Sequence, residues 1–388
     1  MLNGKMIMTG FLSALLACSG GAIMIVQAAA AAGLSTQELV TWFTSVYVIG
    51  GLLNLLLTLI YKIPFAGAHS ITAAAFLSTA AAGFSFSQLA GAFVMSGVII
   101  LICGLTGIFS KALFFLPKSL IDALLAGLLL SYIVGVLPAS IQLPYAGVLA
   151  GVGYFVVPRF LKRLPPVLWA MLLGLIGLSF DYAFPAIPDA AFLPPMFVHA
   201  QFTWEAFMGL AIPMSVLILS NDLAVALASL KGNGFRPPVN KALTASGIAG
   251  MTAGLFGGSA ANVGGLMSAL CSSEEVGPQA SRYKAAIVSS LLVIAFGIGA
   301  WRVIDYIQVL PPHFVAMMTG YSLLGLFLAG LRTIVADRNM RIPAIATFVV
   351  AAFHIQLLGI ATPVWALLVG MIVMKAKARL HPRSQSKR

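Results

Sequence analysis

The sequence predicts an all-α polytopic membrane protein. Of its 388 residues, 60% are hydrophobic and only 8% are charged. A soluble chain carries about 25% charged residues, so this chain has too few to cover a water-exposed surface. Apolar stretches long enough for a helix to cross a bilayer, about 20 residues each, recur from Met6 to Met374. These observations exclude a soluble enzyme, a nucleic-acid-binding protein and a disordered chain.

Fourteen spans are expected, in two sets of seven. They cover 6–29, 37–60, 66–83, 87–109, 115–135, 145–158, 165–183, 205–228, 239–256, 258–272, 284–308, 312–334, 342–360 and 362–376. The third and tenth spans are short and rich in Gly, Ala and Ser. Hydropathy alone therefore supports anything from 11 to 14 crossings.

The positions of the basic residues favour the count of 14. Cytoplasmic loops are enriched in Lys and Arg, and with 14 spans 21 of the 22 basic residues fall on one face. Only Arg302 falls on the other face. This segregation predicts cytoplasmic N- and C-termini in a cell (inner) membrane, with the first apolar segment retained as a span. It also explains the net charge of +12 as an orientation signal.

An internal repeat is expected between residues 1–183 and 205–378, joined by a loop at 184–204 and followed by a basic cytoplasmic tail at 379–388. Similar segments recur in the same order, such as FAGAHSITAAAFLS from Phe65 and FGGSAANVGGLMSA from Phe256. Because each half has an odd number of spans, the second half enters the membrane inverted, as in many secondary transporters. Chance similarity between Gly- and Ala-rich apolar segments is the alternative.

The third and tenth spans are expected to be extended backbone leading into half-helices, one starting at Ile71 and the other at Val263. Non-helical backbone at membrane depth is tolerated only inside protein or beside a cavity. Two opposed half-helix N-termini would offer free N–H groups and positive dipole ends to an anion. Gly258 would let the ligand approach the backbone. Close packing of small residues is the alternative for either segment alone.

Ionisable residues inside spans are candidates for function because they are costly there. Asp222, beside Ser220 and Asn221, is the candidate for carrying a coupling proton; a satisfied structural carboxylate is the alternative. His69, at the tip of the first half-helix, could contact a carboxylate or shuttle a proton, or be merely hydrogen-bonded. Asp122 is expected to be structural.

His354 is likewise expected to be structural, while Gln27 and Asn54 are polar residues that could face a cavity. Buried, inert thiols are expected at Cys18, Cys103 and Cys271. The sequence has no HExxH, CxxC, P-loop or GxSxG motif. We therefore expect no enzyme activity, metal site or cofactor.

The segment from Leu219 to Ser290 resembles the benzoate:proton symporter (BenE) family. It contains a Ser-Asn-Asp cluster in the eighth span, the stretch FGGSAANVGGLMSALC and an Arg-Tyr pair after an acidic loop. The resemblance implies the fold of uracil/xanthine permeases and sulfate-type anion carriers. It also implies a core domain (spans 1–4 and 8–11), a gate domain (spans 5–7 and 12–14), rocking between the two, and often a homodimer.

Carried over to this chain, the resemblance implies a site of seven residues: His69, Ser70, Ser220, Asn221, Asp222, Ser259 and Asn262. The chain departs from the family in three places. Asp222 stands where an Asn is expected, and Ser259 stands where a His is common. In the third span, His69-Ser70-Ile71-Thr72 stands where a Trp-Ser-Thr-Pro-like stretch is expected. These departures leave the substrate and the coupling open.

The sequence therefore predicts a proton-coupled symporter of benzoate or a similar small organic anion, in contact with the lipid bilayer. A carrier of a nucleobase or an inorganic anion, or an uncoupled uniporter or channel-like protein, is the alternative. Nucleobase permeases typically have a Glu after the second half-helix. The corresponding Gly264-Gly265-Leu266 has no acid, which argues against a nucleobase.

Overall fold

The computed structural model of the chain describes residues 3–109, 117–161, 164–185, 192–353 and 362–380. The helices of the first half are α1 (Gly4–Ala31), α2 (Thr36–Tyr61), α3 (Ile71–Ala80), α4 (Phe86–Thr106), α6 (Lys118–Gln142), α7 (Pro144–Phe155), α8 (Val157–Phe160) and α9 (Pro166–Asp181). Those of the second half are α10 (Trp204–Ala206), α11 (Ile212–Leu217), α12 (Ala224–Gly232), α13 (Val239–Leu255), α14 (Gly265–Ser272), α15 (Tyr283–Ile298), α16 (Ala300–Gln308), α17 (Pro312–Ala336), α18 (Arg341–Ala352) and α19 (Thr362–Leu380).

The helical character of the chain agrees with the sequence prediction, and each of the 14 predicted ranges overlaps a described helix. Seven helices within the described ranges are long and apolar enough to cross a membrane. Three more apolar helices are shorter, namely α3, α9 and α18. The count of 14 crossings, the inverted repeat and the division at 184–204 stay predictions.

Several predicted boundaries were wrong. The fifth span was expected to end at 135, but α6 continues through Pro138 to Gln142. The eleventh span was expected to be one helix, but Gly299 separates α15 from α16. A proline inside a helix removes one backbone hydrogen bond without always ending the helix, whereas glycine weakens the helical backbone. The predicted structural role of His354 falls outside the described residues.

Local sequence signals explain where the helices start and stop. Capping boxes begin α2, with Ser35 and Glu38, and α4, with Ser85 and Gln88, so that orphan N–H groups of the first turn are satisfied. Gly107 ends α4 in the left-handed conformation at φ 66°. These signals explain why the boundaries of α2 and α4 were close to those predicted.

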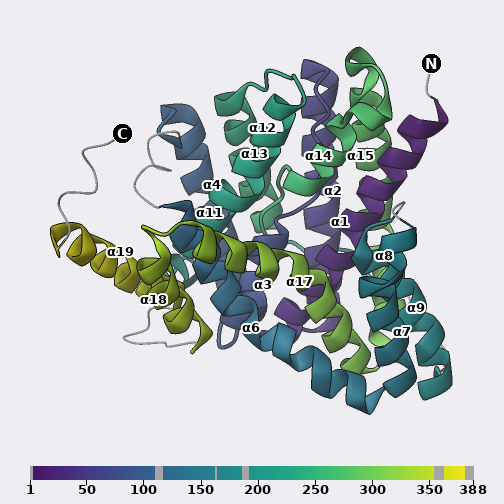
Figure 1. Ribbon diagram of the computed structural model, residues 1–388. Helices are drawn as coiled ribbons and strands as arrows, with labels where there is room; N and C mark the ends of the chain where they lie inside the picture. The colour runs from purple at the N-terminus through teal and green to yellow at the C-terminus, as the bar shows by residue number, and fades with distance from the viewer. Residues whose placement is uncertain (1–2, 110–116, 162–163, 186–191, 354–361, 381–388) are drawn as a thin grey trace.

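Helices of the two halves pack against each other. α4 packs on α13, α1 and α2 pack on α15, and α6 packs on α17 and α18. Figure 1 shows α1, α2, α4 and α11–α15 in the upper part of the view, and α6, α7, α9 and α17 in the lower part. The predicted core and gate would produce this grouping, although the division itself stays a prediction.

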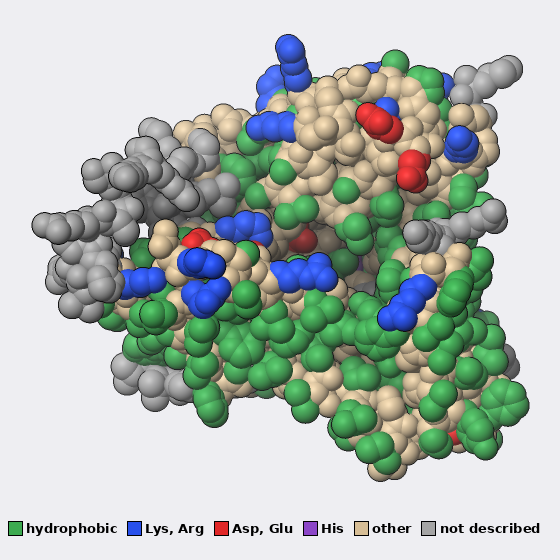
Figure 2. Space-filling view, viewed as in Figure 1, with side chains coloured by type: hydrophobic (Ala, Val, Ile, Leu, Met, Phe, Trp, Pro, Cys, Tyr) green, Lys and Arg blue, Asp and Glu red, His purple; other side chains and the backbone are tan. Residues whose placement is uncertain are grey.

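The face seen in Figure 2 is hollowed between the two groups of helices. Lys and Arg side chains gather at the top of this view and along the hollow, while the lower part of the face is mostly hydrophobic. A chain of this composition needs lipid to cover such a surface.

Close helix contacts depend on glycine, and Gly50 of α2 gives a test. A Cβ at Gly50 would overlap the carbonyl group of Ala68, whereas Gly135 of α6 has no neighbour within 4 Å. We expect Gly50→Ala to destabilise the fold by about 1–3 kcal/mol because neither backbone can move freely. Gly135→Ala is the matched control and should be neutral or stabilise by up to about 1 kcal/mol, because alanine favours a helix more than glycine does. The measurement is the thermal unfolding midpoint in detergent, and equal midpoints for the two variants would contradict the packing described.

Candidate functional site

Two extended segments, 62–70 and 256–264, run antiparallel to each other in the interior of the helix bundle. The amide of Asn262 donates to the carbonyl of Ala68 at 3.0 Å, and the amide of Gly264 donates to Ala66 at 2.9 Å. In the other direction, the amide of Ser70 donates to Ala260 at 3.2 Å. The pairing satisfies backbone groups that have no water to bond. It also brings the start of α3 beside the start of α14.

Small residues and hydroxyl groups make this crossing possible. Gly67 has φ 155°, and a Cβ there would collide with the backbone of Gly264. The hydroxyl of Ser268 accepts from the amide of Ala66 at 3.1 Å and lies 3.0 Å from its carbonyl oxygen. The hydroxyl of Thr58 donates to the carbonyl of Phe65 at 2.8 Å. The crossing is therefore fixed by hydrogen bonds on both sides.

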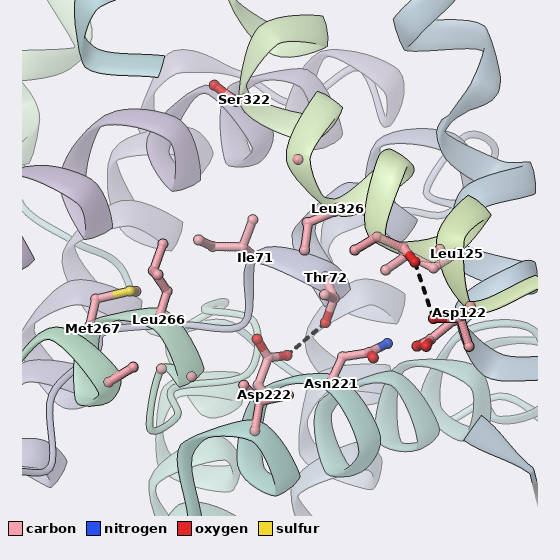
Figure 3. Close-up of a pocket in the computed structure, with 18 of the residues that line it drawn as sticks. Ile71, Thr72, Asp122, Leu125, Asn221, Asp222, Leu266, Met267, Ser322 and Leu326 are labelled. Atoms are coloured by element: carbon pink, nitrogen blue, oxygen red, sulfur yellow. Dashed lines mark hydrogen bonds between the residues drawn. The ribbon is translucent and has the colours of Figure 1, made fainter. Parts of the chain in front are cut away.

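A cavity of about 470 Å³ lies next to the crossing, bounded by α3, α14 and the eighth predicted span on one side and by α6 and α17 on the other. Figure 3 shows Asp222 and Asn221 on one wall, with Thr72 facing Asp222 and with Ser322 and Leu326 of α17 opposite. Its lining residues are His69, Ile71, Thr72, Lys118, Asp122, Leu125, Asn221, Asp222, Val225, Gly264, Gly265, Leu266, Met267, Ala269, Ser322, Gly325, Leu326, Ala329, Gly330 and Thr333.

Asp222 lies beside the N-terminus of α3 and is only 7% exposed. One of its carboxylate oxygens, Oδ2, accepts hydrogen bonds from the hydroxyls of Ser70 and Thr72, the latter at 2.6 Å. Ser70 is also the N-cap of α3, where its hydroxyl accepts from the amide of Ala73 at 2.9 Å. Asp222 belongs to a π-helical turn, Ile218–Leu223, and such turns are frequent at functional sites.

The charges around the cavity leave Asp222 without a cationic partner. Lys118 and Asp122 lie four residues apart on α6 and form a salt bridge of 2.7 Å, so their charges offset each other. No salt bridge to Asp222 occurs in the part of the chain that the structure describes. The positive potential near Asp222 therefore comes mainly from the two helix N-termini.

Three other predicted site residues lie beside Asp222, but only two of them line the cavity. Asn221 lines the cavity, and its Nδ2 has no hydrogen-bond partner among the described residues. His69 also lines the cavity, while its Nε2 lies 3.2 Å from the hydroxyl of Tyr47. Ser220 instead donates to the carbonyl of Val216 in its own helix, at 2.5 Å, and does not line the cavity.

The predicted residues of the second segment lie behind the crossing and do not line the cavity. The hydroxyl of Ser259 accepts from the indole of Trp42 at 3.0 Å. The carbonyl of Asn262 accepts from the side chain of Asn54 at 3.0 Å. Gly258 packs against Ser45, which leaves no room for a Cβ. These residues hold the extended segment in place.

The second half-helix starts at Gly265 and not at Val263 as predicted, because Gly264 is still paired with the first segment. Gly264 and Gly265, rather than Gly258, therefore present backbone to the cavity. Of the other polar candidates, Gln27 and Asn54 do not line this cavity, whereas Asp122 does.

Thr72 and the wall formed by α17 were not among the predicted site residues. Thr72 follows Ser70 by two residues, so its position in the first turn of the half-helix was a usable signal. Ser322 follows Thr319 and Tyr321 in a mostly apolar helix, so it is a weak signal on its own. The apolar wall residues Met267 and Leu326 carry no such signal.

Comparisons with known proteins agree in one family. The family model described as "Benzoate membrane transport protein", BenE, matches residues 2–376. The benzoate membrane transport protein of Acinetobacter baylyi is 26% identical over 375 residues, 95% of each chain. The inner membrane protein YdcO of Escherichia coli is 27% identical over 370 residues, 94% of this chain and 93% of that protein.

Solved structures show the same fold. The transmembrane domain of a cyanobacterial bicarbonate transporter, BicA, is similar with a TM-score of 0.61 at 15% identity, covering 95% of this chain and 97% of that one. SLC26A9 is similar with a TM-score of 0.61 at 12% identity, covering 97% of this chain and 66% of that one.

The orientation of neighbouring residues on the eighth predicted span can be tested with thiol chemistry. Asn221→Cys should place a thiol in the cavity, whereas Ser220→Cys should place one against its own helix. In a chain whose native cysteines are replaced by serine, we expect a small water-soluble thiol reagent to modify Asn221→Cys at least about tenfold faster. Mass spectrometry follows the modification of each variant over time. Equal rates for the two variants would show that Ser220 also faces the cavity.

Proposed function

The chain belongs to the benzoate membrane transport protein (BenE) family, and we propose that it is a proton-coupled symporter of benzoate or a similar small organic anion. The protein is a multi-pass membrane transporter and not an enzyme. The observation that carries the proposal is the cavity in which a buried carboxyl group, Asp222, meets the N-termini of two half-helices.

The carboxylate of the substrate would bind between the starts of α3 and α14. Gly264 is the N-cap of α14 and provides no side-chain hydrogen bond, so the N-cap leaves the first amides of this helix to a ligand in the part of the chain that the structure describes. Helix N-termini attract anions through these amides and through the helix dipole. Because Gly264 and Gly265 have no side chains, an anion can reach the backbone there.

The remaining walls fit an aromatic ring better than a small inorganic ion. Apolar side chains line the cavity from several helices, namely Ile71, Leu125, Val225, Leu266, Met267 and Leu326. Ligand pockets of this kind combine an apolar lining with a few polar groups that fix orientation. The name of the Acinetobacter baylyi relative, a benzoate membrane transport protein, supports the same class of substrate.

Proton coupling would follow from the repulsion between two carboxylates. A substrate anion and an ionised Asp222 would compete for the same helix N-termini, and like charges at short distance disfavour ionisation of both. Protonation of Asp222 removes this repulsion, so the anion and a proton bind together. The hydroxyls of Ser70 and Thr72 would then serve Asp222 in either protonation state, because a hydroxyl can donate or accept.

The orientation and assembly of the protein also remain proposals. We place both termini in the cytoplasm from the segregation of the basic residues, and the cell inner membrane is suggested by the name of the Escherichia coli relative. A homodimer, which the family resemblance implies, stays a prediction.

Uptake into proteoliposomes tests both the substrate and the coupling. An electroneutral one-to-one symporter accumulates its anion about tenfold per unit of pH gradient, since each tenfold ratio corresponds to about 1.4 kcal/mol. We expect Asp222→Asn to abolish accumulation of labelled benzoate while still allowing benzoate exchange without a gradient. Glu274→Gln is the control, because it removes the charge of an exposed carboxyl group that does not line the cavity, and it should keep full accumulation.

Full gradient-driven accumulation by Asp222→Asn would remove this residue from the coupling role. A wild-type protein that takes up nucleobases or inorganic anions but no aromatic or small carboxylate would overturn the proposed substrate class. Electrogenic uptake with no pH dependence would identify a uniporter or a channel-like protein.

A further inference from the structure

A second cavity, of about 300 Å³, lies between a different set of helices and shares no lining residue with the first. Leu15, Cys18, Ser19, Ala22 and Ile23 line it from one face of α1. Opposite them lie residues of α9, α15, α16 and α17, with Leu310 just before α17: Met171, Leu175, Phe296, Val303, Ile307, Leu310, Phe314, Val315 and Met318. Its lining contains no charged residue, which distinguishes it from the cavity around Asp222.

The chemistry of this lining defines its ligand. Phe296 and Phe314 offer aromatic faces, and Met171 and Met318 offer thioethers that contact aromatic rings favourably. The only hydroxyl group in the lining belongs to Ser19, which is 9% exposed. Its oxygen is buried and has no hydrogen-bond partner among the described residues. A buried polar group left unpaired carries a free-energy cost that a ligand can relieve.

We propose that this second cavity, called here the Ser19 cavity, is a binding site for an uncharged aromatic molecule with one hydrogen-bonding group, such as a phenol. The ring occupies the space between α1 and α17, and its hydroxyl bonds to Ser19. The volume is at the lower end of the range for ligand pockets and suits a single ring. A charged carboxylate is excluded because nothing in the lining compensates its charge.

A ligand in the Ser19 cavity acts on transport through α17. This helix lines the Ser19 cavity with Phe314, Val315 and Met318, and it lines the Asp222 cavity from Ser322 to Thr333. Met318 and Ser322 are one helical turn apart. A molecule held between α1 and α17 restrains α17 without occupying the substrate cavity, so it inhibits by lowering the maximal rate and not by raising KM.

Binding of phenol and toluene to the purified protein tests the site without any transport assay. The two molecules have nearly the same shape, but only phenol can bond to Ser19. We expect a saturable rise of the thermal midpoint, with phenol binding about 2- to 10-fold tighter than toluene, the range for one hydrogen bond. Ser19→Ala should reverse this preference, because the phenol hydroxyl would then be buried without a partner. Ser246→Ala, a buried serine whose hydroxyl is also unpaired but which lies on α13, should preserve it.

Val303→Phe fills the Ser19 cavity from α16 and should abolish binding of both molecules. Phenol binding that is unchanged in both Ser19→Ala and Val303→Phe would overturn the proposal. A cavity occupied by a lipid acyl chain would give no saturable effect of phenol, which would overturn it as well.

The transport readout depends on the proposed function, whereas the binding readout does not. In proteoliposomes, phenol should lower the maximal rate of benzoate uptake in the wild type and in Ser246→Ala, but have no effect on Val303→Phe. If benzoate is not transported but binding of phenol depends on Ser19, the proposed function is wrong, whereas the proposed binding site in the Ser19 cavity is supported. Competitive inhibition by phenol would place it in the Asp222 cavity and would overturn the proposed mode of action.

Discussion

The antiparallel pairing of the segments 62–70 and 256–264 is the interaction on which the rest of the structure depends. A span broken in the middle of a membrane exposes amides and carbonyls that no solvent can satisfy, and each unpaired group costs free energy. Here the two extended segments satisfy each other's backbone groups. The amide of Asn262 donates to the carbonyl of Ala68, and the amide of Gly264 donates to the carbonyl of Ala66. The free ends of α3 and α14 then necessarily lie together, so the candidate site is a geometric consequence of the pairing.

The site that results has positive helix ends but no free cationic side chain. Among the described residues, Lys118 is the only Lys or Arg that lines the cavity, and Asp122 offsets its charge. Asp222 and a substrate anion would therefore draw on the same limited positive potential. An arginine at this place would bind an anion with or without a proton. Under the proposed function, a carboxyl group that must first be neutralised makes anion binding depend on the proton.

Some parts of the candidate site could be predicted from the sequence, and others could not. The sequence predicted that the first half-helix starts at Ile71 and that the site lies at this start. Both were predictable because Ser70 is a strong N-cap after a run of small residues. The orientation of Ser220 was not, since Asp222 lies in a π-helical turn where the usual 3.6-residue period fails. Nor could the roles of Ser259 and Asn262 be read, because in an extended segment a shift of one residue exchanges the inward and outward faces. The wall formed by α17 depends on tertiary packing alone.

His69 was expected to contact a carboxylate, shuttle a proton or be merely hydrogen-bonded, and its Nε2 does have a hydrogen-bond partner. The hydroxyl of Tyr47 donates to the carbonyl of Ala17 at 3.1 Å, so its oxygen is left to accept from Nε2–H of His69. The ring of Tyr47 also contacts Phe296, with centroids 4.9 Å apart. His69 lines the Asp222 cavity and Phe296 lines the Ser19 cavity, so these three rings stand between the two. The ring of His69 is therefore held at one nitrogen by Tyr47, and its Nδ1, which is buried and has no partner among the described residues, is the nitrogen left for a ligand.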